Sequence, residues 1–242
     1  LGQLCMPAQL HTLIISDVPG DDPSLVASGP TIPNTSKFSD ALSILKKYDL
    51  DIPPSVSEYL KGKVGEREIT SFIGSHSIIG SSRSSLQAAM SYAKNQGINV
   101  TVLSDAIEGE SRDVGQNMAQ LVMQGNKKGH VYLSGGETTV TVNGRGKGGP
   151  NTEFLLGLAL KLNGTKNVYA LACDTDGVDG SEANAGALVT PDTLTRAQKF
   201  GIDVRTHLEN NDAFTFFEIL GDLVITGPTF TNVNDFRAVL VL

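Results

Sequence analysis

Three clusters of glycines and carboxylates lie between residues 134 and 180, and their residue types are the ones most able to do chemistry. They read Ser-Gly-Gly-Glu-Thr at 134–138, Gly-Arg-Gly-Lys-Gly-Gly-Pro-Asn-Thr-Glu at 144–153 and Asp-Thr-Asp-Gly-Val-Asp-Gly at 174–180. Glycines let backbone amides approach a ligand, and successive amides form concave sites for anions. Carboxylates beside such sites can hold Mg²⁺ together with substrate phosphates. The clusters therefore predict a nucleotide or phosphoryl-transfer site.

The second cluster also satisfies Gly-x-Gly-x-x-Gly, the fingerprint of dinucleotide-binding folds. This alternative is weaker, because the strand expected before it, residues 138–142, alternates polar and apolar residues instead of being buried on both faces. No Gly-x-x-x-x-Gly-Lys-Ser/Thr sequence occurs, which excludes a P-loop. The spacing of the 174–180 carboxylates does not fit an EF-hand, so a Mg²⁺-nucleotide site or a simple Asp-rich turn remains.

Residues 147–153 open a predicted helix, whose amides and dipole favour a negative ligand. Glu153 in the first turn serves equally well as a capping carboxylate, and Lys147 as a solvated surface charge. The Asn-Asn-Asp run at 210–212 predicts a helix N-cap. The run 226–235 is dense in hydrogen-bonding groups and is interpreted as a ligand loop.

The composition is that of an ordinary soluble globular protein. The 242 residues are 40% hydrophobic and 19% charged, enough for one large domain or two modest ones. A net charge of −7 gives no general attraction to nucleic acid or to anionic membranes. No apolar run reaches the roughly 18 residues of a membrane span. The two cysteines, Cys5 and Cys173, form no disulfide framework, which predicts a reducing, cytoplasmic location.

Strands that alternate with helices predict an α/β fold with three αβα layers around a mixed, largely parallel sheet. Hydrophobic patterning predicts strands at 10–16, 69–74, 99–104, 130–134, 138–142, 168–173, 187–190, 223–226 and 236–242, with 138–142 antiparallel or at an edge. Apolar stripes at helical spacing predict helices around 41–48, 86–93, 114–122 and 155–162, and shorter helical pieces end at 60 and span 213–220. The polar run 61–68 is the best linker candidate.

Polar residues directly follow five of the predicted strands, at Asp17, Ser104, Ser134, Asp174 and Thr226. In α/β sheets, ligands gather at the carboxyl ends of strands. The five strand ends therefore predict one shared cleft, although strand ends are polar in any α/β protein.

The ordered set of motifs closely resembles the glycerate kinases of the MOFRL family, also called glycerate 2-kinases, many of which carry the label hydroxypyruvate reductase. Beyond the three clusters, the resemblance rests on Ser-Asp-Val-Pro-Gly-Asp-Asp at 16–22, Ala-Ser-Gly-Pro-Thr at 27–31, Gly-Glu at 109–110, Asn-Asp at 211–212 and Thr-Gly-Pro-Thr at 226–229. It implies a kinase that uses ATP and Mg²⁺ to phosphorylate D-glycerate, typically at the 2-hydroxyl, in a cleft between two α/β lobes. Pro150 and Phe230 depart from the arginine and the glycine usual at those positions.

The resemblance also implies a further N-terminal region, with another glycine-rich loop and a lysine thought to be catalytic. We therefore expect this chain to be the C-terminal part of the enzyme. Residues 1–65 would be a remnant of the N-terminal lobe and 66–242 the C-terminal lobe, with a MOFRL-like segment at about 128–236. The expected partners are ATP, D-glycerate and the N-terminal part of the same protein, and a homodimer is the oligomer considered; no nucleic acid or membrane partner is expected.

On this hypothesis no catalytic residue is assigned, because the main lysine is expected in the N-terminal region. The predicted substrate- and nucleotide-binding residues are Asp17, Asp21, Ser134, Gly135, Gly136, Glu137, Lys147, Gly148, Gly149, Asn151, Glu153, Thr226 and Asn232. The predicted metal contacts are Asp176 and Asp179. Two alternatives remain: an NAD(P)H-dependent hydroxypyruvate reductase and a non-catalytic, nucleotide-binding remnant.

Overall fold

The structure is a computed structural model that describes residues 1–33, 36–63, 74–125 and 128–242. The chain divides into two compact units, one of Leu1–Ile14 and Asp22–Ser77, the other of Ile15–Asp21 and Ile78–Leu242. The predicted boundary at 65/66, most of the predicted linker and strand residues 69–73 lie outside the described residues. The division into lobes therefore stays a prediction.

The first unit consists of short elements. These are the 3-10 helices η1 (Gly2–Cys5) and η2 (Val26–Ser28), the helices α1 (Phe38–Lys47) and α2 (Pro54–Lys63), and most of a two-stranded sheet of β1 (Leu10–Ile15) and β2 (Gly74–Gly80). Helices α1 and α2 pack together, and the rings of Phe38 and Tyr59 meet edge to face with centroids 6.2 Å apart. The last residues of both strands belong to the second unit.

The second unit is built on a six-stranded mixed sheet in the order β3-β4-β8-β5-β6-β7. Its strands are β3 (Asn99–Ile107), β4 (His130–Gly136), β5 (Val168–Asp174), β6 (Gly186–Val189), β7 (Leu223–Val224) and β8 (Asp235–Val241). Strands β3, β4, β5 and β7 point the same way, as a largely parallel sheet requires. Parallel pairing is nevertheless confined to β3–β4, because β8 runs in the opposite direction between β4 and β5, and β6 between β5 and β7.

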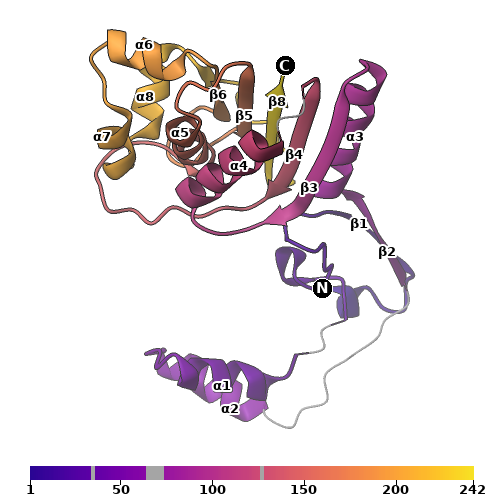
Figure 1. The fold of residues 1–242 in the computed structure, drawn as a ribbon. Helices are drawn as coiled ribbons and strands as arrows, with labels where there is room; N and C mark the ends of the chain where they lie inside the picture. The colour runs from indigo at the N-terminus through magenta and orange to yellow at the C-terminus, as the bar shows by residue number, and fades with distance from the viewer. Residues whose placement is uncertain (34–35, 64–73, 126–127) are drawn as a thin grey trace. The chain divides into compact units, whose positions relative to one another are not determined.

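Helices cover the sheet in the predicted three layers, and the α/β prediction is confirmed (Figure 1). Helix α3 (Ser82–Asn95) lies on one face, against β3 and β4. Helices α4 (Ser111–Gly125) and α5 (Pro150–Leu162) form the layer on the other face, and α6 (Thr193–Lys199), α7 (Val204–Glu209) and α8 (Ala213–Leu220) pack around α5.

Alternation along the strands explains these layers. In β4, Val131 and Leu133 join the core under α3, whereas Tyr132 joins the larger core around α5. Helix α5 is apolar on every side and almost wholly buried, as expected for a helix enclosed by a sheet and other helices. Helices α4 and α5 approach closely, since a Cβ added at Gly115 would lie 2.1 Å from the carbonyl oxygen of Phe154.

Two local predictions are wrong or incomplete. Residues 138–142 form no strand and contribute only an isolated bridge between Glu110 and Thr139. The reason is that the Asp235 carboxylate accepts the Thr138 amide at 3.4 Å, where the chain leaves the sheet. Helices α6 and α7 went unpredicted because each is too short for a clear apolar stripe.

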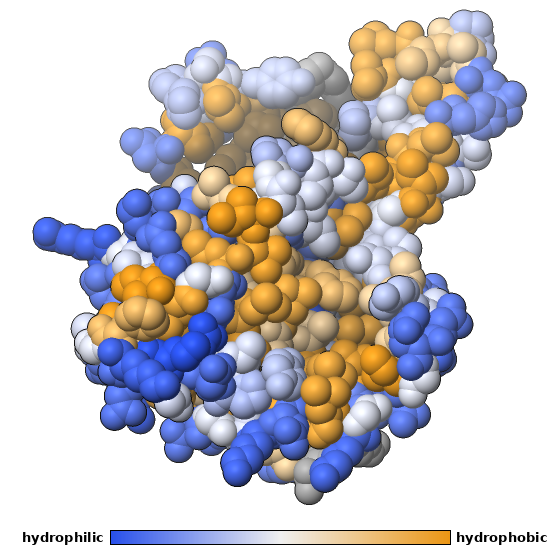
Figure 2. Space-filling model, turned by 90° about the horizontal axis from the view of Figure 1, so that it is seen from above, coloured by the Kyte–Doolittle hydropathy of each residue, from blue (hydrophilic) through white to orange (hydrophobic). Residues whose placement is uncertain are grey.

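One part of the sheet keeps apolar residues at the surface. Tyr169 of β5 and Leu188 of β6 point away from α5 and are 38% and 43% exposed. Figure 2 shows hydrophobic residues gathered in the middle of the face it displays, bordered by hydrophilic residues. Within the described residues, no helix has both the length and the apolar character needed to cross a membrane.

Candidate functional site

Carboxylates crowd at one end of the second unit's sheet, where β3, β4 and β5 end and β8 begins. We call Asp17, Glu108, Glu137, Asp174, Asp176 and Asp235 the acidic cluster. Asp235 is central to it, because its backbone pairs with Gly136 on one side and with Asp174 on the other. The structure thus brings together the predicted residues Asp17, Glu137 and Asp176 at neighbouring strand ends.

Burial and neighbouring acids raise the pKa of two carboxyls of the acidic cluster, those of Glu137 and Asp235. Burial raises the pKa of Glu137, and the nearby charges of Asp235, Asp17 and Glu108 raise this pKa further. Burial also raises the pKa of Asp235, although the attached Arg237 opposes this. Carboxylates of like charge this close together mark a place where a bound cation would be stabilised.

Asp174 and Asp176 lie on one turn within the acidic cluster. The Asp174 carboxylate accepts the Asp176 amide at 3.0 Å, and Asp176 accepts the Val178 amide at 2.8 Å. Burial, with the neighbouring Asp176 and Asp235, raises the pKa of Asp174 to about 7. Among the described residues, no three His, Cys, Asp or Glu side chains are arranged to hold a metal ion alone. Mg²⁺ needs only one or two carboxylates beside substrate phosphates, so the donor set fits that ion.

Asp179 differs from the acidic cluster in its surroundings, because it is buried against the first turn of α5. Its Oδ1 accepts the Asn151 amide at 2.8 Å, and its Oδ2 accepts the Thr152 amide and hydroxyl, both at 2.8 Å. The side chain is 1% exposed, and burial raises its pKa to about 6 although these hydrogen bonds oppose the shift. The negative group predicted at this helix N-terminus is therefore the protein's own carboxylate. This geometry gives Asp179 a positioning role in place of a metal contact.

The glycine-rich loop, residues 143–149, is fixed by three consecutive residues that we call the clamp segment: Asn210, Asn211 and Asp212. Asn211 Oδ1 accepts the amides of Asn143 and Gly144 at 2.8 and 2.9 Å. The backbone carbonyl of Asn210 accepts the Gly146 amide at 2.9 Å, and its side-chain Oδ1 accepts the Arg145 amide at 3.1 Å. Asp212 Oδ1 accepts the Lys147 amide at 2.9 Å. The predicted N-cap run therefore holds a loop 65 residues away in sequence.

The predicted anion-binding amides of the loop are thus largely occupied. The Lys147 amide is bound by Asp212, and the Gly149 amide donates to Thr152 Oγ1 at 3.0 Å. The side chain of Lys147 is different: it is 60% exposed and lies 3.5 Å from Glu182. Gly149 must be glycine, because an added Cβ would meet the Asp179 backbone at 2.3 Å.

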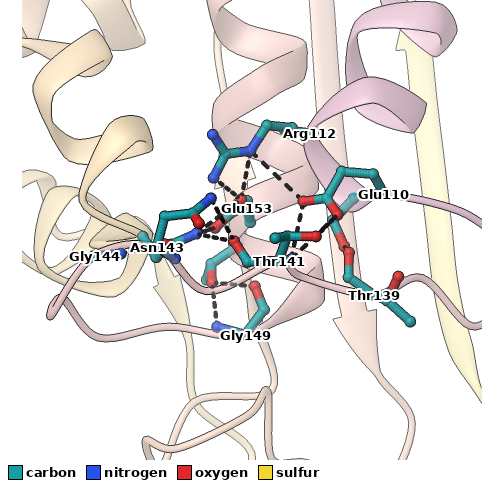
Figure 3. Close-up of polar contacts among 11 residues, drawn as sticks. Glu110, Arg112, Thr139, Thr141, Asn143, Gly144, Gly149 and Glu153 are labelled. Atoms are coloured by element: carbon teal, nitrogen blue, oxygen red, sulfur yellow. Dashed lines mark hydrogen bonds and ion pairs between the residues drawn. The ribbon is translucent and has the colours of Figure 1, made fainter.

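An ion pair between the buried Glu153 and the half-buried Arg112 ties the loop to helices α4 and α5 (Figure 3). Glu153 is 2% exposed and accepts Arg112 Nε at 2.8 Å and Asn211 Nδ2 at 3.1 Å. Arg112 also lies 3.7 Å from Glu110, whose carboxylate accepts the Thr141 hydroxyl at 2.8 Å. Glu153 and Asn151 therefore orient the loop and the helix start, and both are buried away from solvent.

The Ser-Gly-Gly predicted to bind anions lies inside the sheet. Ser134, Gly135 and Gly136 form the last residues of β4 and are buried. A Cβ at Gly135 would meet Ser82 Oγ at 2.0 Å, and one at Gly136, whose φ is 118°, would meet the Ile107 backbone at 2.2 Å. Packing therefore explains these glycines, and only Glu137 reaches the surface from this motif.

The remaining predicted residues lie on loops around the acidic cluster. The 226–231 loop lies against the 174–180 loop, since the Thr229 amide donates to the Asp176 carbonyl at 2.8 Å. Thr226 and Asn232 are exposed on the run 226–235, whose role as a ligand loop stays a prediction. Asp21 has a φ of 57°. It lies near enough to Arg83 for its negative charge to help raise the pKa of that side chain.

Sequence reasoning missed the buried polar residues of β8. Arg237 is fully buried, forms an ion pair with Asp235 and donates to Thr138 Oγ1 at 3.1 Å. Asn151 Nδ2 donates to Asp235 at 2.6 Å and links this pair to α5. A charged pair at alternate positions of an otherwise apolar strand was the signal available in the sequence.

Comparison with known proteins places the chain in a family. The profile of the MOFRL family matches residues 130–235, and a profile described as a domain of unknown function (DUF4147) matches residues 1–61. The chain is 46% identical, over all of its length and 65% of the relative's, to an Agrobacterium vitis protein named "Putative hydroxypyruvate reductase". It is 35% identical to a Thermotoga maritima protein named D-glycerate 2-kinase, with 95% of the chain and 56% of the relative covered.

The fold matches a solved structure over the whole chain. Superposition on the crystal structure of glycerate kinase from Thermotoga maritima gives a TM-score of 0.91 at 33% identity and covers 59% of that protein. The chain thus spans little more than half to two thirds of the length of these relatives. Motifs, fold and relatives agree: the chain belongs to the MOFRL family, whose members include the glycerate kinases.

Proposed function

We propose that the protein containing this chain is a kinase that transfers the γ-phosphoryl group of ATP to D-glycerate, at the 2-hydroxyl. The observation that carries the proposal is the acidic cluster, in which the half-buried Asp174 and Asp176 lie beside the buried Asp235. Relatives named glycerate kinase and D-glycerate 2-kinase support the substrate and the position. We also propose that this chain supplies one side of the site and that the rest of the longer protein completes it.

The chemistry asked of these residues is positioning and charge neutralisation, which dominate phosphoryl transfer. Asp174 and Asp176 would hold Mg²⁺ on the nucleotide phosphates, with Glu137 beside them, and the bound ion would neutralise charge on those phosphates. Lys147 would meet the phosphates from the loop, while Thr226 and Asn232 would orient the ligand. No general base is assigned to this chain.

Phosphorus NMR of the full-length gene product with ATP, Mg²⁺ and D-glycerate tests this proposal. We expect 2-phosphoglycerate and ADP to appear together. A 3-phosphoglycerate signal would move the reaction to the other hydroxyl, and no transfer to glycerate would refute the kinase.

A hydroxypyruvate reductase is the second candidate, because it is the name carried by the Agrobacterium vitis relative. The structure gives this candidate less support, since no strand leads into the glycine-rich loop as a dinucleotide site requires. Steady loss of NADH absorbance with hydroxypyruvate would favour the reductase over the kinase.

A further inference from the structure

The glycine-rich loop is held more tightly than its composition suggests. Glycines usually leave a loop free to change conformation. Here the amides from Asn143 to Lys147 all donate to the clamp segment, and the Lys147 carbonyl accepts the Phe214 amide at 2.9 Å. Cβ atoms added at Gly144 and Gly146 would lie 2.1 Å and 2.3 Å from atoms of Asn210 and Asp212. The glycines therefore serve contact with the clamp segment.

Asn211 connects the loop to the ion pair of Glu153 and Arg112. Its φ is 52°, and its side chain accepts two loop amides while its Nδ2 donates to Glu153. Glu153 in turn is held by Arg112 from α4. The loop is thus fixed, through Asn211 and Glu153, against helices α4 and α5.

We propose that the clamp segment preorganises the glycine-rich loop, so that the loop binds the nucleotide phosphates through the Lys147 side chain and not through its amides. This inference rests on the proposed kinase function for the identity of the ligand. Lys147 is available for the task, because its pair with Glu182 is long and exposed, and such pairs contribute little. Asn211 and Asp212 are positioning residues in this arrangement.

Hydrogen exchange of the full-length gene product tests the grip without reference to activity. In Asp212→Ala and Asn211→Gly, we expect peptides that cover 143–147 to exchange at least roughly tenfold faster, and trypsin to cut faster after Arg145 and Lys147. Asn211→Gly suits the positive φ, so its effect reports the lost side chain and not backbone strain. Asp212→Asn keeps the Oδ1 acceptor and should stay close to wild type. Unchanged protection in both disruptive variants would overturn the inference.

Kinetics test the recognition. We expect Lys147→Met and Asp212→Ala to raise the KM for ATP roughly tenfold with a smaller change in kcat, the loss expected for one charged hydrogen bond. Asp212→Asn and Lys161→Met, at an exposed lysine of α5, should leave the KM unchanged. A loosened loop with an unchanged KM would overturn the assignment of Lys147. A wild-type enzyme without phosphoryl transfer would refute the proposed function, whereas faster exchange in Asp212→Ala would still support the clamp.

Discussion

At the scale of single residues, Asp179 shows how a buried carboxylate can look like a metal ligand in sequence. It lies in an Asp-rich run, yet its two oxygens accept four donors from Asn151 and Thr152 at the start of α5. Its charge complements the positive end of the helix dipole. The stability of the glycine-rich loop and of α5 therefore depends on this side chain.

We expect Asp179→Ala to lower the free energy of unfolding by about 3 kcal/mol or more, because several buried donors lose their acceptor. Urea unfolding measures this change. Asp179→Asn keeps the volume and one oxygen, and should cost less. An alanine variant within about 0.5 kcal/mol of wild type would show that these hydrogen bonds contribute nothing.

The raised pKa values predict how stability depends on pH. The pKa is about 7 for Asp174 and about 6 for Asp179, against an ordinary value of 3.8, so between these limits the folded state holds protons that the unfolded state has released. Stability from these groups should therefore fall as pH rises from about 4 to about 7, and level off above that. Melting temperatures measured across this pH range in EDTA test this dependence. The Asp174→Asn variant should show a smaller change of melting temperature between about pH 6 and 7. A melting temperature that rises across this range would contradict the assignment.

At the scale of elements, the pair of helices α4 and α5 carries the buried charge of the site. Glu153 lies in the first turn of α5 and Arg112 in the first turn of α4. Besides Gly115, Gly157 lets the helices approach, because an added Cβ there would lie 2.4 Å from the Arg112 carbonyl oxygen. Removing one partner of this ion pair should destabilise the fold, because the buried charge of the other would be left without compensation.

We therefore expect Arg112→Met to destabilise the protein by about 3–5 kcal/mol, because Glu153 would stay buried without its cation. The double variant Arg112→Met with Glu153→Leu should recover part of that loss. Chemical unfolding of the wild type, the two single variants and the double variant gives the coupling energy. A double variant less stable than the Arg112→Met single would contradict the expected recovery.

Long elements were predictable from the sequence, and buried polar contacts were not. Apolar stripes predicted α3, α4 and α5 within a few residues, because packing on one core follows a helical period. The N-cap run at 210–212 predicted α8. The 138–142 segment alternates like a strand, but Asp235 and Glu110 take its hydrogen bonds at its two ends. A partner 97 residues away leaves no trace in local pattern.

At the scale of the whole molecule, the polar residues expected together at carboxyl strand ends include acids that the structure brings close to one another. Asp17 lies near Glu137, and both Glu137 and Asp174 lie near Asp235. That a ligand binds there stays a prediction. The roles of individual glycines could not be predicted, because the sequence shows that a residue is glycine but not whether a ligand or close packing requires it. Gly135 and Gly149 belong to the second kind.

Ligand-linked stability tests the acidic cluster as a unit. We expect ATP with Mg²⁺ to raise the melting temperature of the full-length gene product, and ATP with EDTA to raise it much less, because the ion is needed to offset the carboxylates. Asp174→Asn with Asp176→Asn should remove the difference between the two conditions. Equal shifts with and without Mg²⁺ in the wild type would argue against a metal at this cluster.

Strand β8 has a consequence for assembly of the fold. The β3–β4 pair and the β5–β6–β7 group share no ladder of their own, and β8 alone joins them. Residues up to 234 can therefore form two half-sheets but not the continuous sheet. Asp235 and Arg237 become buried only when β8 pairs with β4 and β5. Pairing of β4 with β8 closes a loop of roughly 100 residues, and contacts between residues so distant in sequence form slowly. We therefore expect the acidic cluster to form after the helices have packed.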